Sequence, residues 1–399
     1  MRSVYPVGTT LYRPEQCCNG YTLISGSGGV KLVDMNGRTA HHWPVDPASA
    51  GSPKGRPRGF IHRARLLPDG RLMILVGDRD GVPGHIEEYD WDNRLLWQYA
   101  PTDGKPHHDF YPTPAGTVLL LCDLPVPREL SEAVQDPARR GLTIYGDVVI
   151  EVDRDGQVVW RWLHHEHLDL NRCNPTPASR DWPGGPDNNT VTDWTHTNTV
   201  QSLPENRWFD AGDERFRPGN VLISMRQLDT ILIIDRPSGE VAWSYTGTFR
   251  GGLSGQHEPH MIEKPLPGAG NILVFDNGSS PRDLAHAGRS LVVEIDPPAG
   301  EVVWHYEDGH NFYSPFTSNC QRLANGNTLI MEAQGRRMFE VTPAGQIVWE
   351  HVTTDNAQRV FRYAYDFCPQ SAALPRPTEL SVTPPKQFTI PPDAERDAQ

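Results

Sequence analysis

The stretch Asp34-Met-Asn-Gly-Arg-Thr-Ala-His-His-Trp43 decides the fold of this chain, because its pattern returns five more times. Each copy places a turn rich in Asp, Asn, Pro or Gly before a short run that closes on tryptophan. The later copies end at Trp97, Trp160, Trp243, Trp304 and Trp349, at successive spacings of 54, 63, 83, 61 and 45 residues. Such a turn between two short runs is typical of paired antiparallel strands. Repetition at about 40–50 residues or more indicates the blades of a β-propeller.

A second repeated phrase precedes the first, a Pro- or Gly-containing turn that leads into an apolar strand. It occurs at residues 67–75, 113–121, 217–223, 267–274 and 323–330, and in reduced form at 20–24. A blade therefore consists of an inner strand, a turn, two middle strands, the Asp/Gly turn and an outer strand that ends at the tryptophan. The first blade lacks its own inner strand, which residues 359–367 can supply. We predict an all-β, six-bladed β-propeller closed by joining N- and C-terminal strands in one blade, which removes exposed sheet edges.

The domain organisation expected from these repeats is simple. Residues 1–369 form one propeller domain, and residues 129–137 are the one short helical pattern, expected at the surface. Residues 163–192 are rich in Pro, Asn, Gly and Asp and are predicted to be an insertion that covers the channel like a lid. Residues 370–399 form a Pro-rich, polar tail, expected to be an extended strap or a disordered end.

Composition narrows the classes of partner. The 399 residues carry a net charge of −13 at pH 7, which argues against nucleic-acid binding. No run of 18 or more apolar residues is present, so no membrane span is expected, and the first residues lack a hydrophobic signal region. The six cysteines, which form no C-x-x-C pair, favour reduced thiols and a cytoplasmic protein; they are Cys17, Cys18, Cys122, Cys173, Cys320 and Cys368.

Histidines recur shortly before the turns of successive blades. His62 and His108 each precede such a turn by five residues, and His196 and His257 precede the turns of the next two blades. The fifth repeat has Asn319 at this place. If the blades are equivalent, these side chains lie on the innermost strands at similar depth and surround the mouth of the channel. A single strand histidine is usually an ordinary hydrogen-bonded residue, but the repeat itself does not require four.

Two interpretations of the histidine ring stay open from the residues alone. In the first, one imidazole is a nucleophile and the others bind an anionic group, with Arg226 as a fixed cation, because imidazole titrates near neutral pH. In the second, His62, His108, His196 and His257 bind one Cu, Fe or Zn ion. Carboxylates then orient the rings from behind; the candidates are Asp109, Asp193 and Glu258. An enzyme of this second kind would be an oxidoreductase, an oxygenase or a lyase.

The chain resembles the PAPS-independent arylsulfotransferases, a family of six-bladed propellers, over roughly residues 12–368. The motifs that carry the resemblance are His107-His-Asp109, Asp193-Trp-Thr-His-Thr-Asn198, Ser224-Met-Arg226, Gln256-His257 with Phe275-Asp-Asn-Gly278, and Ser314-Pro-Phe-Thr-Ser-Asn319. Together with the opening residues 20–37, they occur in the family's order.

The resemblance implies a reaction and the roles of several residues. A sulfuryl group would pass from an aryl sulfate ester to a phenolic acceptor through a sulfated His257. His108, His196 and Arg226 would hold the sulfuryl oxygens and handle the phenol proton, without a cofactor. Candidate substrate-binding residues are His107, Asn198, Asn319 and His260. Asp276, in the turn after the Gln-His motif, would orient His257.

The sequence departs from the family's pattern in ways that keep the alternative open. His62 adds a fourth histidine, which favours a metal site, and His260 is a competing ligand or base three residues after His257. Under either interpretation the expected partner is a small, aromatic molecule, with no nucleic acid and no membrane. A binding propeller without catalysis is the third interpretation.

Overall fold

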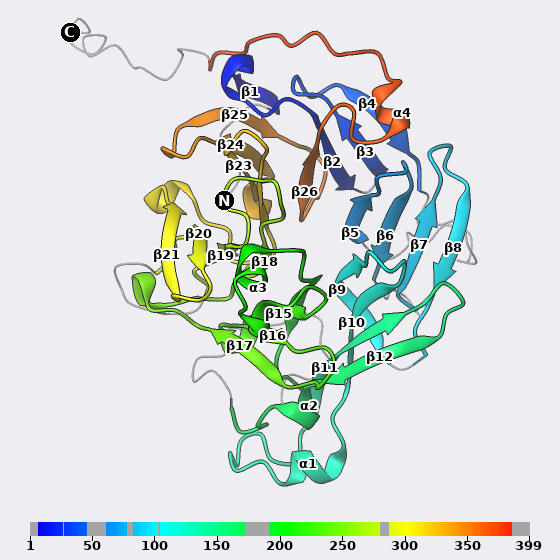
Figure 1. The fold of residues 1–399 in the computed structure, drawn as a ribbon, viewed down its shortest axis with the longest axis vertical. Coiled ribbons are helices and arrows are strands. Elements are labelled where there is room, and N and C mark those ends of the chain that lie inside the picture. The colour runs from blue at the N-terminus through cyan, green and yellow to red at the C-terminus, as the bar shows by residue number, and fades with distance from the viewer. Residues whose placement is uncertain are drawn as a thin grey trace, which may run out of the picture.

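Six antiparallel sheets stand in a ring in the computed structural model, which describes residues 7–26, 28–45, 61–77, 83–102, 104–172, 191–279 and 287–384 (Figure 1). The predicted fold class, an all-β six-bladed propeller, is confirmed. No helix within these residues is long and apolar enough to cross a membrane. Their five cysteines are free thiols, and Cys173 lies outside the described ranges.

Blades 1 to 3 are built from strands that follow the two repeated phrases. From the axis outward, blade 1 has β26 (Val360–Tyr363), β2 (Tyr21–Gly26), β3 (Gly29–Val33) and β4 (Thr39–Trp43). Blade 2 has β5 (Ile61–Leu66), β6 (Leu72–Val76), β7 (His85–Tyr89) and β8 (Leu95–Tyr99). Blade 3 has β9 (Lys105–Pro112), β10 (Val118–Pro125), β11 (Thr143–Val152) and β12 (Val158–Leu163), and β13 (Val191–Asp193) pairs with β11.

Blades 4 to 6 repeat the same order. Blade 4 has β14 (Thr197–Ser202), β15 (Val221–Met225), β16 (Thr230–Ile234) and β17 (Val241–Tyr245). Blade 5 has β18 (His257–Met261), β19 (Ile272–Asp276), β20 (Leu291–Asp296) and β21 (Glu301–Tyr306). Blade 6 has β22 (Asn319–Arg322), β23 (Thr328–Glu332), β24 (Arg337–Val341), β25 (Ile347–Val352) and, outermost, β1 (Gly8–Tyr12).

Helices are short and lie outside the blades. The α-helices are α1 (Arg128–Glu132), α2 (His164–His167), α3 (Arg207–Asp210) and α4 (Pro369–Ala372). The 3-10 turns are η1 (Pro14–Gln16), η2 (Glu214–Phe216), η3 (Arg226–Leu228), η4 (Phe249–Gly251), η5 (Gly309–Asn311) and η6 (Ala333–Gly335). Helix α1 overlaps the first part of the helical pattern expected at 129–137. The predicted lid begins with α2, but residues 173–190 lie outside the described ranges, so its covering of the channel stays a prediction.

Six of the seven hydrophobic clusters among the described residues form layers, one between each pair of neighbouring blades. The buried side chains of the second and third strands of one blade pack against those of the next, as Leu32 of blade 1 and Leu72 of blade 2 do in one cluster. The same packing recurs around the ring and returns from blade 6 to blade 1. Each layer is worth about 25 cal/mol for every Å² of apolar surface it removes from water, so the blades stabilise one another.

The repeat tryptophans connect each blade to the next, which explains why the repeat ends on this residue. Every one of the six donates its indole N–H to a backbone carbonyl in the outer turn of the following blade. The pairs are Trp43–Asp90 (3.1 Å), Trp97–Arg154 (2.9 Å), Trp160–Arg236 (3.1 Å), Trp243–Pro297 (2.9 Å), Trp304–Pro343 (2.8 Å) and Trp349–Met35 (2.7 Å). The last pair joins blade 6 to blade 1, so the set of hydrogen bonds forms a closed circle.

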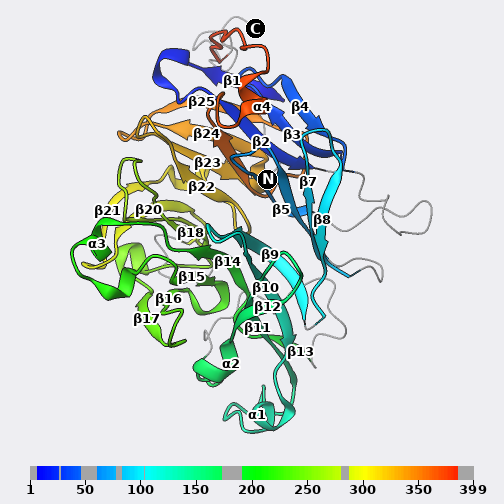
Figure 2. The same cartoon turned by 45° about the vertical axis from the view of Figure 1, so that its right-hand side comes forward.

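The ring is closed by both ends of the chain. Strand β26 supplies the inner strand of blade 1, with Val360 opposite Ile24 and Tyr363 opposite Tyr21, as the sequence predicted. Strand β1 adds an outer strand to blade 6. After α4 the chain runs along the outside of these blades (Figures 1 and 2), and Val382 forms a backbone bridge with Tyr12. Helix α4 occupies the start of the predicted tail, residues 373–384 follow without a further helix or strand, and residues 385–399 lie outside the described ranges, so the nature of the tail stays a prediction.

Candidate functional site

The inner strands of blades 3, 4 and 5 share an irregular backbone near their first residues. Their pairing with the second strands shifts register there. His108, His196 and Glu258 have left-handed φ values of 56°, 46° and 55°. Non-glycine residues in this conformation cost of order 1–3 kcal/mol each and are concentrated at functional sites. Bulges of this kind re-aim side chains, and here they do so in the part of each strand that carries a predicted site residue.

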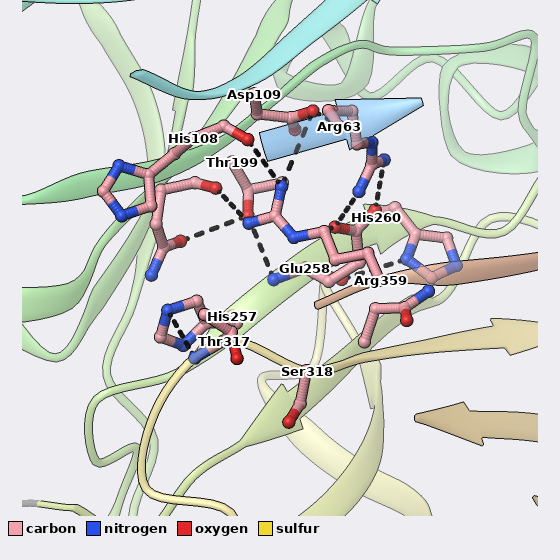
Figure 3. A network of polar contacts seen from close by, with 12 residues as sticks. Arg63, His108, Asp109, Thr199, His257, Glu258, His260, Thr317, Ser318 and Arg359 are labelled. Carbon is pink, nitrogen blue, oxygen red and sulfur yellow. Dashed lines mark hydrogen bonds and ion pairs between the residues drawn. The ribbon is translucent and has the colours of Figure 1, made fainter. Parts of the chain in front are cut away.

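His257 is buried and held in one tautomer. Its Nδ1 lies 2.7 Å from Asn277 Oδ1 and 3.0 Å from the Gly255 carbonyl, so Nδ1 carries the proton and donates it. Its Nε2 accepts the backbone N–H of Thr317 at 3.2 Å (Figure 3). Burial, followed by the nearby guanidinium groups of Arg226 and Arg359, holds the pKa of His257 well below its usual value. The ring is therefore neutral at pH 7, with its lone pair on Nε2.

Asn277 is a site residue that sequence reasoning missed. Its Nδ2 donates to the carbonyls of Ser314 (2.7 Å) and Thr317 (3.0 Å), which turns Oδ1 toward His257. The adjacent Asp276, which the resemblance implied for this role, instead accepts the backbone N–H of Ser254 at 2.9 Å. The family turn at residues 275–278 thus does lie beside His257, and the amide rather than the carboxylate makes the contact.

Three other predicted histidines gather close to one another. The ring of His108 lies 4.7 Å from that of His196 and 5.8 Å from that of His62, centroid to centroid. His196 Nδ1 contacts a carboxylate oxygen of Asp193, so its other nitrogen is directed elsewhere. His108 Nδ1 lies 2.7 Å from Nδ1 of His107. Burial, followed by the neighbouring His196, keeps the pKa of His108 well below its usual value.

Arg226 brings a buried positive charge to this group. It opens η3 directly after β15, and its backbone N–H donates to the carbonyl of His196 at 3.3 Å. The residue is 6% exposed, and its guanidinium makes no hydrogen bond or ion pair with any residue that the structure describes. Burial lowers the pKa of Arg226, although Asp193 and Asp229 oppose this shift. A buried cation without a close anionic partner is costly, which is typical of a site that binds an anion.

A second layer of charged side chains lies next to the histidines (Figure 3). Arg63 binds both carboxylate oxygens of Glu258, at 2.5 and 2.6 Å, and its Nε lies 3.1 Å from Asp109. Arg359, just before β26, donates to the carbonyls of His108 (3.0 Å) and Asn198 (2.6 Å) and lies 3.3 Å from Glu258. Burial alone would raise the pKa of Glu258, but Arg63 and Arg359 hold it well below its usual range. This network fixes the backbone that carries His108 and His257.

Three predicted substrate-binding residues have partners within the ring. Asn198 Nδ2 donates to the Gln256 carbonyl at 2.7 Å. Asn319 bonds both backbone groups of Val360, at 2.8 and 3.0 Å. His260 Nδ1 contacts the Glu258 carbonyl at 3.0 Å, and Figure 3 places it across Glu258 from His108 and His257. The two amides therefore connect the inner strands of neighbouring blades, and substrate binding by any of the three stays a prediction.

The metal interpretation depends on how His62 is placed. Its ring occupies space left by Gly77, where an added Cβ would lie 2.4 Å from Nε2. Burial lowers the pKa of His62 to about 3, so the ring is neutral, as a metal ligand must be. However, the described residues contain no group of three or more His, Cys, Asp or Glu that could hold one ion. The four-histidine metal site thus gains no support from these residues and stays a prediction.

Comparison with known proteins adds a family and a set of folds. A family model described as Arylsulfotransferase (ASST) matches residues 63–354. Similar solved structures include a protein of unknown function from Bacteroides caccae, with 13% identity, 86% of this chain and 98% of that chain covered, and a TM-score of 0.48. A streptogramin B lyase matches at 11% identity, with 90% and 86% covered and a TM-score of 0.43. Virginiamycin B lyase from Staphylococcus aureus matches at 9%, with 90% and 89% covered and a TM-score of 0.42. No curated protein matches the chain.

Proposed function

Because the chain belongs to the arylsulfotransferase family, we propose that it moves a sulfuryl group from an aryl sulfate ester to a phenolic acceptor through a sulfated His257. The observation that carries this proposal is that a buried cation and a buried neutral imidazole lie next to each other. Arg226 is a buried cation whose guanidinium forms no hydrogen bond or ion pair with a described residue, and His257 beside it is a neutral imidazole with its lone pair on Nε2. One group suits a sulfate oxygen and the other suits its sulfur.

The first half of the reaction follows from these positions. As the ester enters, its anionic oxygens bind the guanidinium of Arg226. Nε2 of His257 then gives up its hydrogen bond from the backbone N–H of Thr317 and approaches the sulfur atom. The Nε2–S bond forms while the bond from sulfur to the aryl oxygen breaks, and the electron pair leaves on the phenolate. The Nδ1–H of His257 stays bonded to Asn277, so the positive charge that develops on the ring is shared with an oriented amide oxygen.

The second half returns the enzyme to its starting state. The oxygen of an acceptor phenol attacks the sulfur, the Nε2–S bond breaks, and its electron pair returns to Nε2. The acceptor phenol loses its proton in this second half-reaction, whereas the departing phenolate gained a proton in the first. His108 and His196 stand beside each other near His257 and are the groups we assign to these proton transfers, at a contribution of about 10²–10⁴-fold to the rate.

The test is a donor–acceptor assay with matched histidine variants. We expect 4-nitrophenyl sulfate to release its phenol faster as a second phenol is added, with parallel-line kinetics, and we expect the enzyme mixed with donor alone to gain the mass of one SO₃ group. His257→Ala should abolish both, whereas His305→Ala, in the outer strand β21, should abolish neither. Turnover that survives in His257→Ala would rule out this nucleophile. The absence of transfer from any aryl sulfate would rule out the function.

A further inference from the structure

Behind His108 lie His107, which the sequence analysis lists as a candidate substrate-binding residue, and Asp147, and the proposed reaction has given neither of them a role. Nδ1 of His107 is 2.7 Å from Nδ1 of His108, and Nε2 of His107 is 3.1 Å from a carboxylate oxygen of Asp147 in β11. The two imidazole rings stand at 89° with their centroids 4.9 Å apart. Two ring nitrogens at this distance need a proton between them, because two lone pairs would repel. The three side chains therefore form a continuous row, joined by a hydrogen bond between the two imidazoles and an ion-pair contact between His107 and Asp147.

The surroundings of Asp147, at the end of this row of three side chains, favour its ionised form. It is 3% exposed, and its second carboxylate oxygen accepts the Thr195 hydroxyl and the Thr197 backbone N–H, the latter at 2.7 Å. Burial would raise the pKa of Asp147, but its contact with His107 and its other donors hold it below its usual range. A buried carboxylate of this kind needs a positive partner, and His107 is the ionisable group that touches it.

His107 is correspondingly suited to hold a proton. Burial alone would lower the pKa of His107, but Asp147 outweighs it, and the pKa is raised. The ionisable groups that face His107 come from each element packed around it: Asp147 on β11, Asp123 on β10, Asp193 on β13, His108 on β9, His62 on β5 and His164 on α2. Three of these are carboxylates, and the nearest of them, Asp147, lies 3.1 Å from Nε2 of His107, whereas Nδ1 of His107 lies 2.7 Å from Nδ1 of His108. Of the two rings in contact, His107 is thus the one placed beside a carboxylate that can stabilise an extra proton.

We propose that Asp147, His107 and His108 form a proton relay in which His107 stores the proton that each half-reaction gives or takes through Nε2 of His108. This inference rests on the proposed sulfuryl transfer. His107 and Asp147 are positioning and relay residues, since neither touches the substrate, whereas His108 faces the reacting group.

The relay balances in both directions. In the resting state His107 carries protons on both nitrogens, and His108 carries one on Nε2. When Nε2–H of His108 passes its proton to the departing phenolate, the Nδ1 proton of His107 moves to Nδ1 of His108. Both rings are then neutral, and the phenol leaves intact. The acceptor phenol reverses these moves as its oxygen attacks sulfur: its proton goes to Nε2 of His108, and the Nδ1 proton returns to His107.

A second histidine–carboxylate pair nearby differs from this relay in its exposure. The Asp193 side chain, bonded to His196, is 43% exposed, so that pair exchanges protons with water. The Asp147 side chain is 4% exposed, whereas the two histidine side chains are alike, at 16% for His107 and 13% for His196. The difference between the two pairs therefore lies at the carboxylate, and Asp147 is the one that is closed to water.

The experiment compares leaving groups in a His107→Gln variant, because glutamine can accept or donate a hydrogen bond but cannot carry the proton. Phenyl sulfate, whose phenol has a pKa near 10, needs protonation of its leaving oxygen. The 4-nitrophenolate ion leaves without it. We expect turnover of phenyl sulfate to fall by about 10²-fold and that of 4-nitrophenyl sulfate by less than about threefold. An equal fall for both substrates would overturn the relay and leave His107 a purely structural role.

Two further measurements separate this inference from the proposed function and from misfolding. In ¹⁵N-histidine NMR spectra, the wild-type protein should show one strongly deshielded proton shared by two imidazole nitrogens, and His107→Gln should lack it; its absence from the wild type would also overturn the relay. This readout needs no substrate, so it stands even if no aryl sulfate is turned over. Thr195→Val is the matched control, because it removes a donor to the same carboxylate and leaves the chain of three side chains intact. It should change both substrates by the same factor.

Discussion

The guanidinium of Arg359 donates a hydrogen bond to the backbone carbonyl of His108 at 3.0 Å, across 251 residues of sequence. Arg359 immediately precedes β26, the strand that closes the ring, and it also binds Glu258 next to His257. The element that completes the propeller thus also holds the site in shape.

Replacement of Arg359 by methionine should therefore be costly. The substitution removes one of the cations that neutralise Glu258, and it removes the hydrogen-bond donors to the backbone carbonyls of His108 and Asn198. We expect the free energy of unfolding to fall by about 3–5 kcal/mol, measured by denaturant titration. Arg128→Met is the control, because its ion pair with Glu132 is exposed and should be worth less than about 1 kcal/mol. Equal costs for the two variants would contradict the role of Arg359.

Arg226 should behave in the opposite way. Arg226→Met removes a buried cation that has no partner among the described residues, so the free energy of unfolding should stay the same or rise. Turnover of an aryl sulfate should nevertheless fall by about 10²–10³-fold, as expected when a fixed donor to the reacting oxygens is lost. Sulfate ion should raise the melting temperature of the wild type and not that of the variant. A variant that loses stability would show that Arg226 is a structural residue.

Stability should fall on the acid side because several histidines are buried in neutral form. Burial, helped by Arg362, lowers the pKa of His351 to about 4, and the ring contacts Thr9 at 3.0 Å. As the pH falls below about 6.5, His351 becomes protonated in the unfolded chain but stays neutral in the folded one. The free energy of unfolding therefore falls with the pH until the pKa of His351 in the folded protein is reached. His351→Gln should lose roughly 2 kcal/mol less than the wild type between pH 7 and pH 5.

The control for this pH effect is His42→Gln, which replaces an exposed imidazole on β4. Its difference in unfolding free energy between pH 7 and pH 5 should match that of the wild type. A His351 variant that follows the wild-type slope would contradict the assignment of acid sensitivity to this ring.

Metal removal discriminates between the two enzymatic interpretations. Sulfuryl transfer through His257 needs no metal, so exhaustive chelation followed by dialysis should leave the transfer rate unchanged, and His62→Ala should retain it. Elemental analysis of protein purified without chelator gives the complementary result. A stoichiometric metal that is lost in His62→Ala, together with loss of activity, would favour the four-histidine metalloenzyme instead.

The fold was predictable because its signals are local. The turn-and-tryptophan phrase fixes the outer strands, and the absence of an inner strand before residue 20 pointed to residues 359–367, where β26 is found. The gathering of His108, His196 and His257 was also predictable, because equivalent positions of a propeller face one axis. The contacts that each imidazole ring makes could not be predicted, because Asn277 and Asp147 reach the rings through tertiary contacts that the repeat does not encode.

The charged layer was missed although the sequence holds a sign of it. The residue after each of three repeat histidines is ionisable: Arg63 after His62, Asp109 after His108 and Glu258 after His257. Arg63 and Glu258, which bind each other, lie 195 residues apart, so the pairing itself could be known only from the closed ring.

The exchange of strands between the two ends has a consequence for biosynthesis. Blade 1 has no inner strand until β26 has left the ribosome, and β26 brings Arg359 with it. A nascent or shortened chain that lacks β26 has neither a closed ring nor the cation that fixes the backbone of His108. We therefore expect the ring and the support of His108 to be completed in one late event of synthesis.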